Sequence, residues 1–368
     1  MPIHRPLVAV AAIAVSVLLA GCGYASRSAP ASPAPTVVDT RPLAQLPLLA
    51  DPLDYVGPST AVLANTPITP AGGAPTQQLP ATVSSHDLGG DTTVKVTSTK
   101  RILGLDMSGS IAATLYGLGF GNRVVGRDIA TTFPEAVDLP VVTSGASSVN
   151  NEAIIALRPD LVITDGTIGP IDVLLQLRDA GITVVFVETD PSLDGVGELA
   201  RQVGAALGAA PAGDALAERL QADITAKAAE IAAIAPADPA KKLRMLFLYL
   251  RGASGIYYLF GEESGADVLI NALGGIDVAG EIGWKGMKPM TDEALVAADP
   301  DLILVMTDGL ASVGGVDGLL ESKPAIALTR AGQNKRFVDM ADGEILSFGP
   351  RTAGVLDALA RAIYAPSR

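Results

Sequence analysis

Hydrophobic positions divide the chain into three regions with different patterns. Residues 7–18 form an apolar run broken only by Ser16. Between residues 23 and 80 prolines are frequent, and neither a helical nor an alternating period is sustained. From about residue 100 onward, short apolar runs typical of buried strands alternate with segments of helical period. We therefore expect the core in this last region and a mostly disordered segment before it, because a proline-rich stretch buries too little apolar surface to fold. Within that segment Leu43 to Leu53 is apolar enough to dock on the folded part.

The region after residue 100 contains a repeated unit. The segment that starts Glu152-Ala-Ile-Ile-Ala-Leu-Arg-Pro-Asp returns as Glu293-Ala-Leu-Val-Ala-Ala-Asp-Pro-Asp. In each copy a residue able to cap a helix, Asn150 or Thr291, stands two positions before the glutamate, and an apolar strand follows the Pro-Asp pair. Further strands are predicted at 102–105, 124–125, 184–187, 245–250 and 256–259. This alternation predicts two similar halves, each with a parallel α/β sheet.

One long helix is predicted between the halves. Residues 213–234 contain no proline and no internal glycine, and Leu216, Leu220 and Ile224 recur at helical spacing. Such a helix is about 33 Å long at 1.5 Å per residue. The predicted fold class is α/β, with two Rossmann-like lobes joined by a rigid helix and a ligand cleft between the lobes. The predicted boundaries are a signal peptide over 1–21, a lipid-anchored disordered Pro/Ala-rich tether over 22–97, an N-terminal lobe over 98–194, a helical connector over 195–235 and a C-terminal lobe over 236–368.

The first residues look like an export signal. The apolar run is too short to span a bilayer but has the length of a signal-peptide core. It ends at Leu19-Ala20-Gly21-Cys22, which resembles the bacterial lipobox and contains the only cysteine of the chain. An ordinary secretory signal with an unrelated thiol is the alternative. We expect a mature chain that starts at a lipidated Cys22, on the outer face of the cytoplasmic membrane.

Composition excludes several functions. The chain has 368 residues, 49% hydrophobic and 18% charged, with net charge −13, one cysteine and two histidines. A nucleic-acid partner is not expected, because no cluster of Lys and Arg is present. An internal disulfide or a histidine-rich zinc site cannot form. The Gly-x-Ser-x-Gly elbow, the phosphate loop and the Gly-x-Gly-x-x-Gly turn are all missing from the sequence, so we do not expect an enzyme.

From about residue 100 to the C-terminus, eight short motifs carry a family resemblance. They are Gly126-Arg127-Asp128, Asn151-Glu152-Ala153, Tyr249-Leu250-Arg251-Gly252, Gly274-Gly275, Lys288-Pro289-Met290-Thr291, Val305-Met306-Thr307, Ser312-Val313-Gly314-Gly315-Val316-Asp317-Gly318 and Phe348-Gly349-Pro350-Arg351-Thr352. With them the sequence resembles the substrate-binding lipoproteins of hemin ABC transporters, within the iron-siderophore and cobalamin binding-protein family. The resemblance implies the class III periplasmic binding protein fold. It also implies a monomer that carries hemin to a membrane permease and its ATPase, with heme as transported ligand.

Tyr249 and Arg251 are the main candidate site residues. On the predicted strand they share one face, at the carboxyl end where clefts open in such sheets. A phenolate is a hard donor suited to ferric heme, and a neighbouring guanidinium favours the phenolate over the phenol. Spacing alone leaves open that the two residues lie at the end of a strand without binding a ligand. The resemblance implies that Tyr249 is the heme-iron ligand and Arg251 its partner.

The sequence differs from the family at the position of the second iron ligand. Close hemin-binding relatives have a histidine before the Asn-Glu helix, and the position that aligns best here is Ser147, which is a poor iron ligand. The first choice is ligation by the tyrosine alone. The alternatives are a thioether from Met107, Met287 or Met290, or His86 folding back. A ferric siderophore or a corrinoid such as cobalamin remains the alternative cargo.

Other residues are candidates for ligand support. Met107 and Ser108 precede a predicted helix whose free N–H groups suit a propionate, and Arg351 opens the last helix, where it could pair with a carboxylate. Ordinary helix capping and a surface arginine explain both equally well. Trp284, Tyr257 or Tyr258 could stack on a porphyrin, although burial in the core is the safer interpretation.

Glu152 and Glu293 are the candidate docking residues. They occupy equivalent places in the two repeats, in the first turn of a helix, where the helix dipole alone stabilises a carboxylate. The dipole explains each glutamate separately but not why both halves have one. In the family these positions look like the carboxylates that meet permease arginines, one for each lobe.

Overall fold

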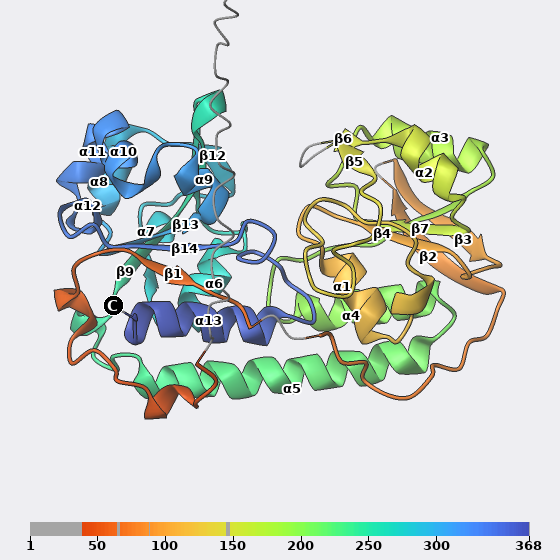
Figure 1. Ribbon diagram of the computed structural model, residues 1–368, viewed down its shortest axis with the longest axis horizontal. Helices are drawn as coiled ribbons and strands as arrows, with labels where there is room; N and C mark the ends of the chain where they lie inside the picture. Colours follow the sequence, from red (N-terminus) through yellow and green to blue (C-terminus); the bar gives the residue numbers. More distant parts are fainter. Residues whose placement is uncertain (1–38, 65–66, 88, 145–147, 368) are drawn as a thin grey trace, which may run out of the picture. The chain divides into compact units, whose positions relative to one another are not determined.

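The structure is a computed structural model that describes residues 39–64, 67–87, 89–144 and 148–367 (Figure 1). Val38–Arg368 forms one compact unit. The boundaries predicted between two lobes inside it therefore stay predictions. The predicted signal peptide, Cys22 and Ser147 lie outside the described residues.

A small parallel sheet lies in the first half of this unit, with strand order β4-β7-β8. Eleven of its twelve strand residues are buried, which explains why these strands are continuous apolar runs without alternation. A two-stranded pair, β5 and β6, lies nearby. The bounds are β4 (Ile102–Leu105), β5 (Thr143–Ser144), β6 (Ser148–Val149), β7 (Leu161–Thr164), β8 (Thr183–Phe186), α1 (Ser110–Gly117), α2 (Asn151–Leu157), α3 (Ile171–Asp179) and α4 (Gly195–Ala206).

A large mixed sheet forms the second half, in the order β1-β14-β13-β9-β10-β12, with β11 beside β9. The expectation of an all-parallel sheet is wrong here. β10 is antiparallel to β9, because the turn between them is far too short for a crossover connection. The strands are β1 (Ser59–Ala61), β9 (Arg244–Arg251), β10 (Ile256–Phe260), β11 (Ile276–Asp277), β12 (Met287–Pro289), β13 (Leu302–Met306) and β14 (Phe337–Met340). The helices are α6 (Ala266–Ala272), α7 (Val278–Glu281), α8 (Asp292–Ala298), α9 (Thr307–Ala311), α10 (Gly315–Ser322), α11 (Pro324–Leu328), α12 (Arg330–Gln333) and α13 (Thr352–Tyr364).

The long helix α5 spans Ala210–Ile234 and has 25 residues (Figure 1). It starts three residues before the predicted position, because Pro211 is tolerated in the first turn, where its missing N–H has no partner to lose. Leu216, Leu220, Ile224 and Ile231 form its buried stripe. α5 packs against α4 at one end and against α13 at the other. The expected fold class, α/β with one long connecting helix, is confirmed.

The repeated unit is confirmed down to its hydrogen bonds. Asn150 Oδ1 accepts from Ala153 N at 3.0 Å, and Thr291 Oγ1 accepts from Ala294 N at 3.2 Å, so both predicted caps are formed. The carboxylates of the two Pro-Asp pairs also act alike. Asp160 accepts from the backbone N–H of Arg101, just before β4. Asp301 accepts from the backbone N–H of Arg244, the first residue of β9. Each carboxylate ties the end of a repeat helix to the start of a neighbouring strand.

The expectation of a disordered tether is wrong for its described part. Leu43, in the 3-10 helix Leu43–Gln45, is 1% exposed and packs in the main core. β1 pairs with β14 in parallel at the edge of the large sheet. β2 (Ala81–Asp87) and β3 (Gly90–Val96) form an antiparallel hairpin that lies against β8. This segment therefore covers one edge of each sheet.

Long-range contacts explain why sequence reasoning missed this segment. Three residues of β1 carry no periodic signal, and their partner strand β14 lies almost 280 residues later, as the hydrogen bond from Thr60 Oγ1 to Asp339 Oδ1 records. The hairpin is polar, but Ser85 is fully buried, because its hydroxyl accepts from Phe186 N at 2.8 Å. Asp87 pairs with Arg178 across the same contact. The strand predicted at 124–125 is reduced to a single bridge between Val124 and Ile102.

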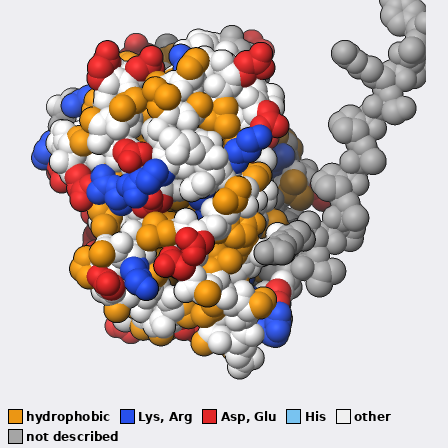
Figure 2. Space-filling model, turned by 90° about the vertical axis from the view of Figure 1, so that its left-hand side faces the viewer, with side chains coloured by type: hydrophobic (Ala, Val, Ile, Leu, Met, Phe, Trp, Pro, Cys, Tyr) orange, Lys and Arg blue, Asp and Glu red, His pale blue; other side chains and the backbone are white. Residues whose placement is uncertain are grey.

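Charges of both signs are interspersed on the face of the molecule shown in Figure 2. Charged residues of the described chain also form ion pairs between elements, such as Arg244 with Glu281 and Lys335 with Asp317. These pairs are exposed enough that water and salt screen them, so they contribute little to stability.

Packing of the N-terminal segment can be tested at Leu43. Leu43→Ala should lower the free energy of unfolding by about 2–4 kcal/mol, since a buried leucine side chain is lost and a cavity remains. Leu48, which is 38% exposed in the same segment, is the matched control, and Leu48→Ala should cost less than about 1 kcal/mol. Urea unfolding measures both. Equal, negligible effects would show that the segment does not pack.

Candidate functional site

Tyr249 and Arg251 lie at the carboxyl end of β9, on one face of the large sheet. The Arg251 guanidinium carbon is 4.5 Å from the centroid of the Tyr249 ring, so the two side chains stack. Tyr249 is half-buried. Among the described residues its hydroxyl has no hydrogen-bond partner. The pair therefore leaves an aromatic oxygen beside a guanidinium, free for a ligand.

A row of apolar and aromatic side chains continues from Tyr249 across the sheet. Tyr258 of β10 is directly opposite Tyr249, with ring centroids 6.5 Å apart. Phe260 stacks on Tyr249 at 5.9 Å, and Met287 of β12 is opposite Phe260, which places Met287 on the same face. On the other side Met306 ends β13 beside Tyr249. Phe260 is buried beneath this row, and Tyr249, Tyr258, Met306 and the exposed Met287 form a partly exposed hydrophobic ledge above the core.

Arg251 is also held by groups outside the pair. Its Nη1 donates to Leu250 O at 2.8 Å, and its Nη2 donates to Asp342 Oδ2 at 2.7 Å. Asp342 follows β14, and its other oxygen accepts from Asp308 N at the start of α9. The charge of Arg251 is therefore already shared with a carboxylate. No sequence signal pointed to Asp342, because it is remote from β9 in the chain.

The start of α1 does not offer free N–H groups, which corrects the propionate site expected there. The Asp106 carboxylate accepts from the backbone N–H groups of Ser108, Ser110 and Ile111 and from the Ser108 hydroxyl. The buried carboxylate thus takes the place of an external anion. Asp106 directly follows β4, and that position at a strand's carboxyl end is the signal that could have found it.

Asp106 belongs to a buried acidic group. Its backbone N–H donates to Asp128 Oδ2 at 3.2 Å, and both side chains are at most 1% exposed. Burial, followed by repulsion from Asp128 and Asp165, raises the pKa of Asp106 to about 7. Burial also raises the pKa of Asp128. Both carboxyl groups therefore hold a proton more readily than exposed carboxyl groups do.

A cavity of about 310 Å³ lies between loops of the two sheets. From the small sheet Ser108, Asp165, Thr167 and Thr189 contribute polar groups, and Leu346 and Phe348 close it from the large sheet. The Ser110 hydroxyl is 3.3 Å from that of Ser347 across this contact. Ser108 therefore lies where predicted, between the two halves, while Tyr249 is not part of this lining. Beside the cavity Met107 and Ile129 are exposed by 49% and 48%.

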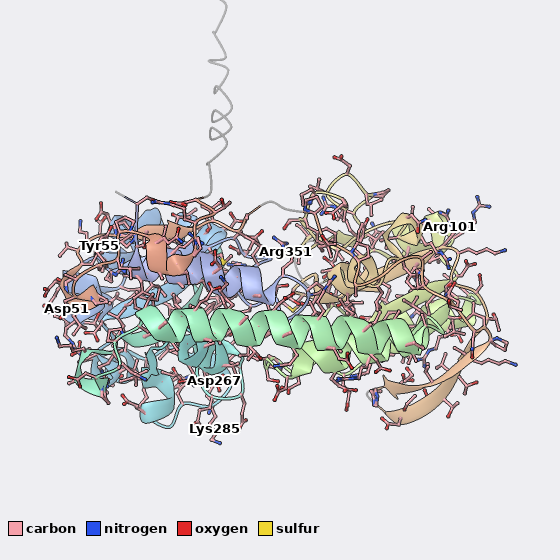
Figure 3. All side chains as sticks on the ribbon, turned by 90° about the horizontal axis from the view of Figure 1, so that it is seen from below. Asp51, Tyr55, Arg101, Asp267, Lys285 and Arg351 are labelled. Carbon is pink, nitrogen blue, oxygen red and sulfur yellow. The ribbon has the colours of Figure 1, made fainter. Side chains whose placement is uncertain are left out.

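Arg351 lies apart from these groups. It lies just before α13 (Figure 3). It is paired with Glu344, and both side chains are largely buried. It lines a different cavity, of about 480 Å³, formed with residues 63–64 and 67–69, α5 and the start of α13. The structure thus does not bring Arg351 together with Ser108 or Tyr249.

The remaining aromatic and sulfur candidates separate into two groups. Trp284, Tyr257 and Met290 pack on the core of the opposite sheet face, and the Trp284 indole donates to Leu259 O. Met107 and Met287 are exposed, Met287 by 55%. His86 lies in the β2–β3 hairpin, where its Nδ1 is 3.0 Å from Asp91 Oδ1. Among the described residues no cluster of three or more His, Cys, Asp or Glu side chains could hold a metal ion.

Glu152 and Glu293 are exposed in the first turns of α2 and α8. The repeats match beyond the glutamates: Ile154 and Leu295 are buried, while Ile155 and Val296, one position later, are each 45% exposed. Each half thus presents a carboxylate and an apolar side chain one turn apart on a short helix. No helix of the described chain is long and apolar enough to cross a membrane.

Two α/β sheets joined by one long helix, with a cavity of mixed polar and apolar lining between them, are typical of a ligand-binding protein. The chain belongs to the periplasmic binding protein family, whose profile matches residues 107–342. Members of this family are non-catalytic binding proteins of transport systems. The chain is accordingly the extracytoplasmic substrate-binding protein of an ABC importer.

Solved structures of heme-binding proteins are similar to this chain. The heme binding protein HmuT superimposes with a TM-score of 0.79 at 37% identity, over 85% of this chain and 99% of that chain. The periplasmic heme-binding protein RhuT from Roseiflexus sp. RS-1 gives a TM-score of 0.64 at 37% identity, over 73% and 98%.

Two relatives that are similar in sequence have names that do not mention heme. An uncharacterized ABC transporter substrate-binding lipoprotein of Bacillus subtilis, YvrC, is 29% identical over 251 residues, 68% of this chain and 76% of the relative. A cobalamin-binding protein of Halobacterium salinarum is 31% identical over 198 residues, 53% of this chain and 51% of the relative. The chain thus spans about half the length of the cobalamin-binding relative.

Proposed function

We propose that this chain captures hemin outside the cytoplasmic membrane and delivers it to an ABC permease. The observation that carries the proposal is the stacked pair of Tyr249 and Arg251 at the end of β9. A tyrosine oxygen without a protein partner suits ferric iron, and the guanidinium stacks on the ring that carries this oxygen. The site binds the iron through Tyr249, and Arg251 supports it.

The ledge beside Tyr249 suits a flat aromatic ligand. Tyr258 and Met306 provide apolar and aromatic contact on the same face, and the buried Phe260 supports the Tyr249 ring from below. Exposed Met287 and, from the other half, Met107 and Ile129 add apolar surface. A porphyrin needs apolar surface on both of its faces, which these groups supply.

Relatives support the same ligand. HmuT, RhuT and BhuT are named as heme-binding proteins, and BhuT was solved with two hemes. HmuT was also studied with a tyrosine replaced by alanine and with an arginine two positions further on replaced by alanine. The same spacing separates Tyr249 from Arg251.

We propose tyrosine as the sole protein ligand of the iron. Met290 packs in a core and His86 pairs with Asp91, so neither side chain is free to ligate. Met107 and Met287 are exposed and remain the sulfur alternatives. Ser108 supports the ligand through its hydroxyl, while Arg351 would first have to leave Glu344.

A corrinoid is the second candidate cargo, and the cobalamin-binding relative favours it. The lack of any histidine after His86 in the sequence points the same way. Titration of the ligand-free protein with hemin, a ferric siderophore and cobalamin, followed by absorption, separates the candidates. We expect saturation by hemin at one equivalent. Saturation by cobalamin alone would replace the proposal.

Lipid attachment and docking complete the proposed role. The protein is anchored through a diacylated Cys22 and works as a monomer on the outer face of the cytoplasmic membrane. Glu152 and Glu293 meet basic residues of the permease, one for each half. Exposed Ile155 and Val296 lie beside them and add apolar contact.

Tyr249→Phe tests the iron ligand. This variant should lose the tyrosinate-to-iron charge-transfer band and bind hemin about 100-fold more weakly, because the ligating oxygen is removed. Tyr258→Phe is the matched control, since Tyr258 is directly opposite on β10, and it should keep both the band and the affinity. A band that persists in the Tyr249 variant would remove this residue from the site.

The double variant Glu152→Ala, Glu293→Ala tests docking. Hemin affinity should be unchanged, while permease-stimulated ATP hydrolysis in vesicles falls about tenfold or more, because paired charges at an interface orient the partners. The matched control replaces Asp172, in the first turn of α3, and Glu321 of α10, both exposed. Equal stimulation by the test and control variants would contradict the docking role.

Cys22→Ser tests the anchor. Metabolic labelling with a fatty acid should mark the wild-type protein and leave the variant unlabelled, because the only thiol of the chain is gone. Label retained in the variant would exclude Cys22 as the attachment point.

A further inference from the structure

Asp342, which is not part of β9, forms an ion pair with Arg251. It lies in the loop that follows β14, and its Oδ2 accepts from Arg251 Nη2 at 2.7 Å. Oδ1 accepts from Asp308 N at 2.9 Å. With 21% of its side chain exposed, Asp342 is partly shielded from water. Both carboxylate oxygens are engaged, so the orientation of the side chain is determined on two sides.

The backbone next to Asp342 is also held in place. A side chain added at Gly343 would bring its Cβ to 2.5 Å from Ala130 O, so the loop lies in direct contact with the small-sheet half. Only a glycine permits this approach. Asp342 is therefore fixed by α9 on one side and by residue 130 on the other, and it provides a rigid acceptor for Arg251.

Arg251 needs such an acceptor. A free arginine side chain samples many rotamers, and contact with one aromatic ring does not select among them. Its bond to Leu250 O comes from a neighbouring residue on the same strand. Among the described residues Asp342 is its only ion-pair partner. The Asp342 carboxylate thus fixes the position of the Arg251 guanidinium above the Tyr249 ring.

We propose that Asp342 is a positioning residue of the ligand site, which holds Arg251 against Tyr249 through a hydrogen bond and so sets the geometry of tyrosinate ligation. This inference rests on the proposed binding of hemin. Asp342 itself does not touch the ligand. An asparagine at this position can keep an oxygen toward Arg251 but loses the bond from Asp308 N, because its amide nitrogen cannot accept, whereas an alanine keeps neither bond.

The test compares Asp342→Ala, Asp342→Asn, Arg251→Ala and the Asp342→Ala, Arg251→Ala double variant. Hemin affinity should fall about tenfold or more in Asp342→Ala, as in Arg251→Ala, because a charge-assisted hydrogen bond is lost. The charge-transfer band should shift in the same way in both. Asp342→Asn should restore the band and keep affinity within about twofold, and the double variant should match Arg251→Ala, since the two residues act in series.

Asp317→Ala is the matched control, because Asp317 forms a surface ion pair with Lys335 in the same half, and it should behave as wild type. Circular dichroism checks that each variant is folded. Wild-type affinity and spectrum in Asp342→Ala would overturn the inference. So would an Asp342→Asn variant as defective as Asp342→Ala, or additive losses in the double variant.

A measurement without hemin separates this inference from the proposed function. In the ligand-free protein the Arg251 Nε–H proton should show an upfield NMR shift from the Tyr249 ring, assigned by its loss in Arg251→Ala. The shift should disappear in Asp342→Ala and persist in Asp342→Asn. If hemin fails to bind the wild type, the proposed function is wrong, and the NMR shift still decides the role of Asp342. A shift that persists in Asp342→Ala overturns that role even if hemin binds.

Discussion

Packing of one helix against two others is the constraint on which the rest of the structure depends. α5 extends about 37 Å at 1.5 Å per residue, and it packs against α4 at one end and α13 at the other. Gly204 and Gly213 let α4 and α5 approach closely, because a Cβ at Gly204 would lie 2.7 Å from the Gly213 backbone. The separation of the two sheets follows from the length of this helix. The loops that meet between them, at Ser110 and Ser347, are therefore held at a fixed spacing.

The two sides of the candidate site have different chemistry. The large sheet supplies an aromatic oxygen, a guanidinium and an apolar ledge, and the small sheet supplies hydroxyls above a buried acidic pair. Among the described residues the cavity lining includes no arginine, the residue that would pair with the charges of a highly anionic chelate.

Much of this arrangement could be predicted from local sequence. The repeat, both caps, the long helix and the shared face of Tyr249 and Arg251 depend on contacts within a few residues or on strand periodicity. What could not be predicted depends on pairing between remote segments: β1 with β14, Ser85 with Phe186, and Asp342 with Arg251. The prediction of free N–H groups at the start of α1 was wrong for a related reason. The Asp106 carboxylate, at the end of the preceding strand, accepts from these N–H groups, and the sequence pattern did not indicate that contact.

The N-terminal segment covers one edge of each sheet, and this arrangement affects the order in which parts of the protein fold. β1 pairs with β14, so the first strand of the described chain cannot find its neighbour until nearly all residues have been synthesised and moved across the membrane. Such non-local pairing is slow, because closing a long loop costs entropy before any contact forms. Until β1 has paired, the edge of β14 is open to other strands. Completion of the large sheet therefore comes late, after β14 has crossed the membrane, and β1 then protects its edge.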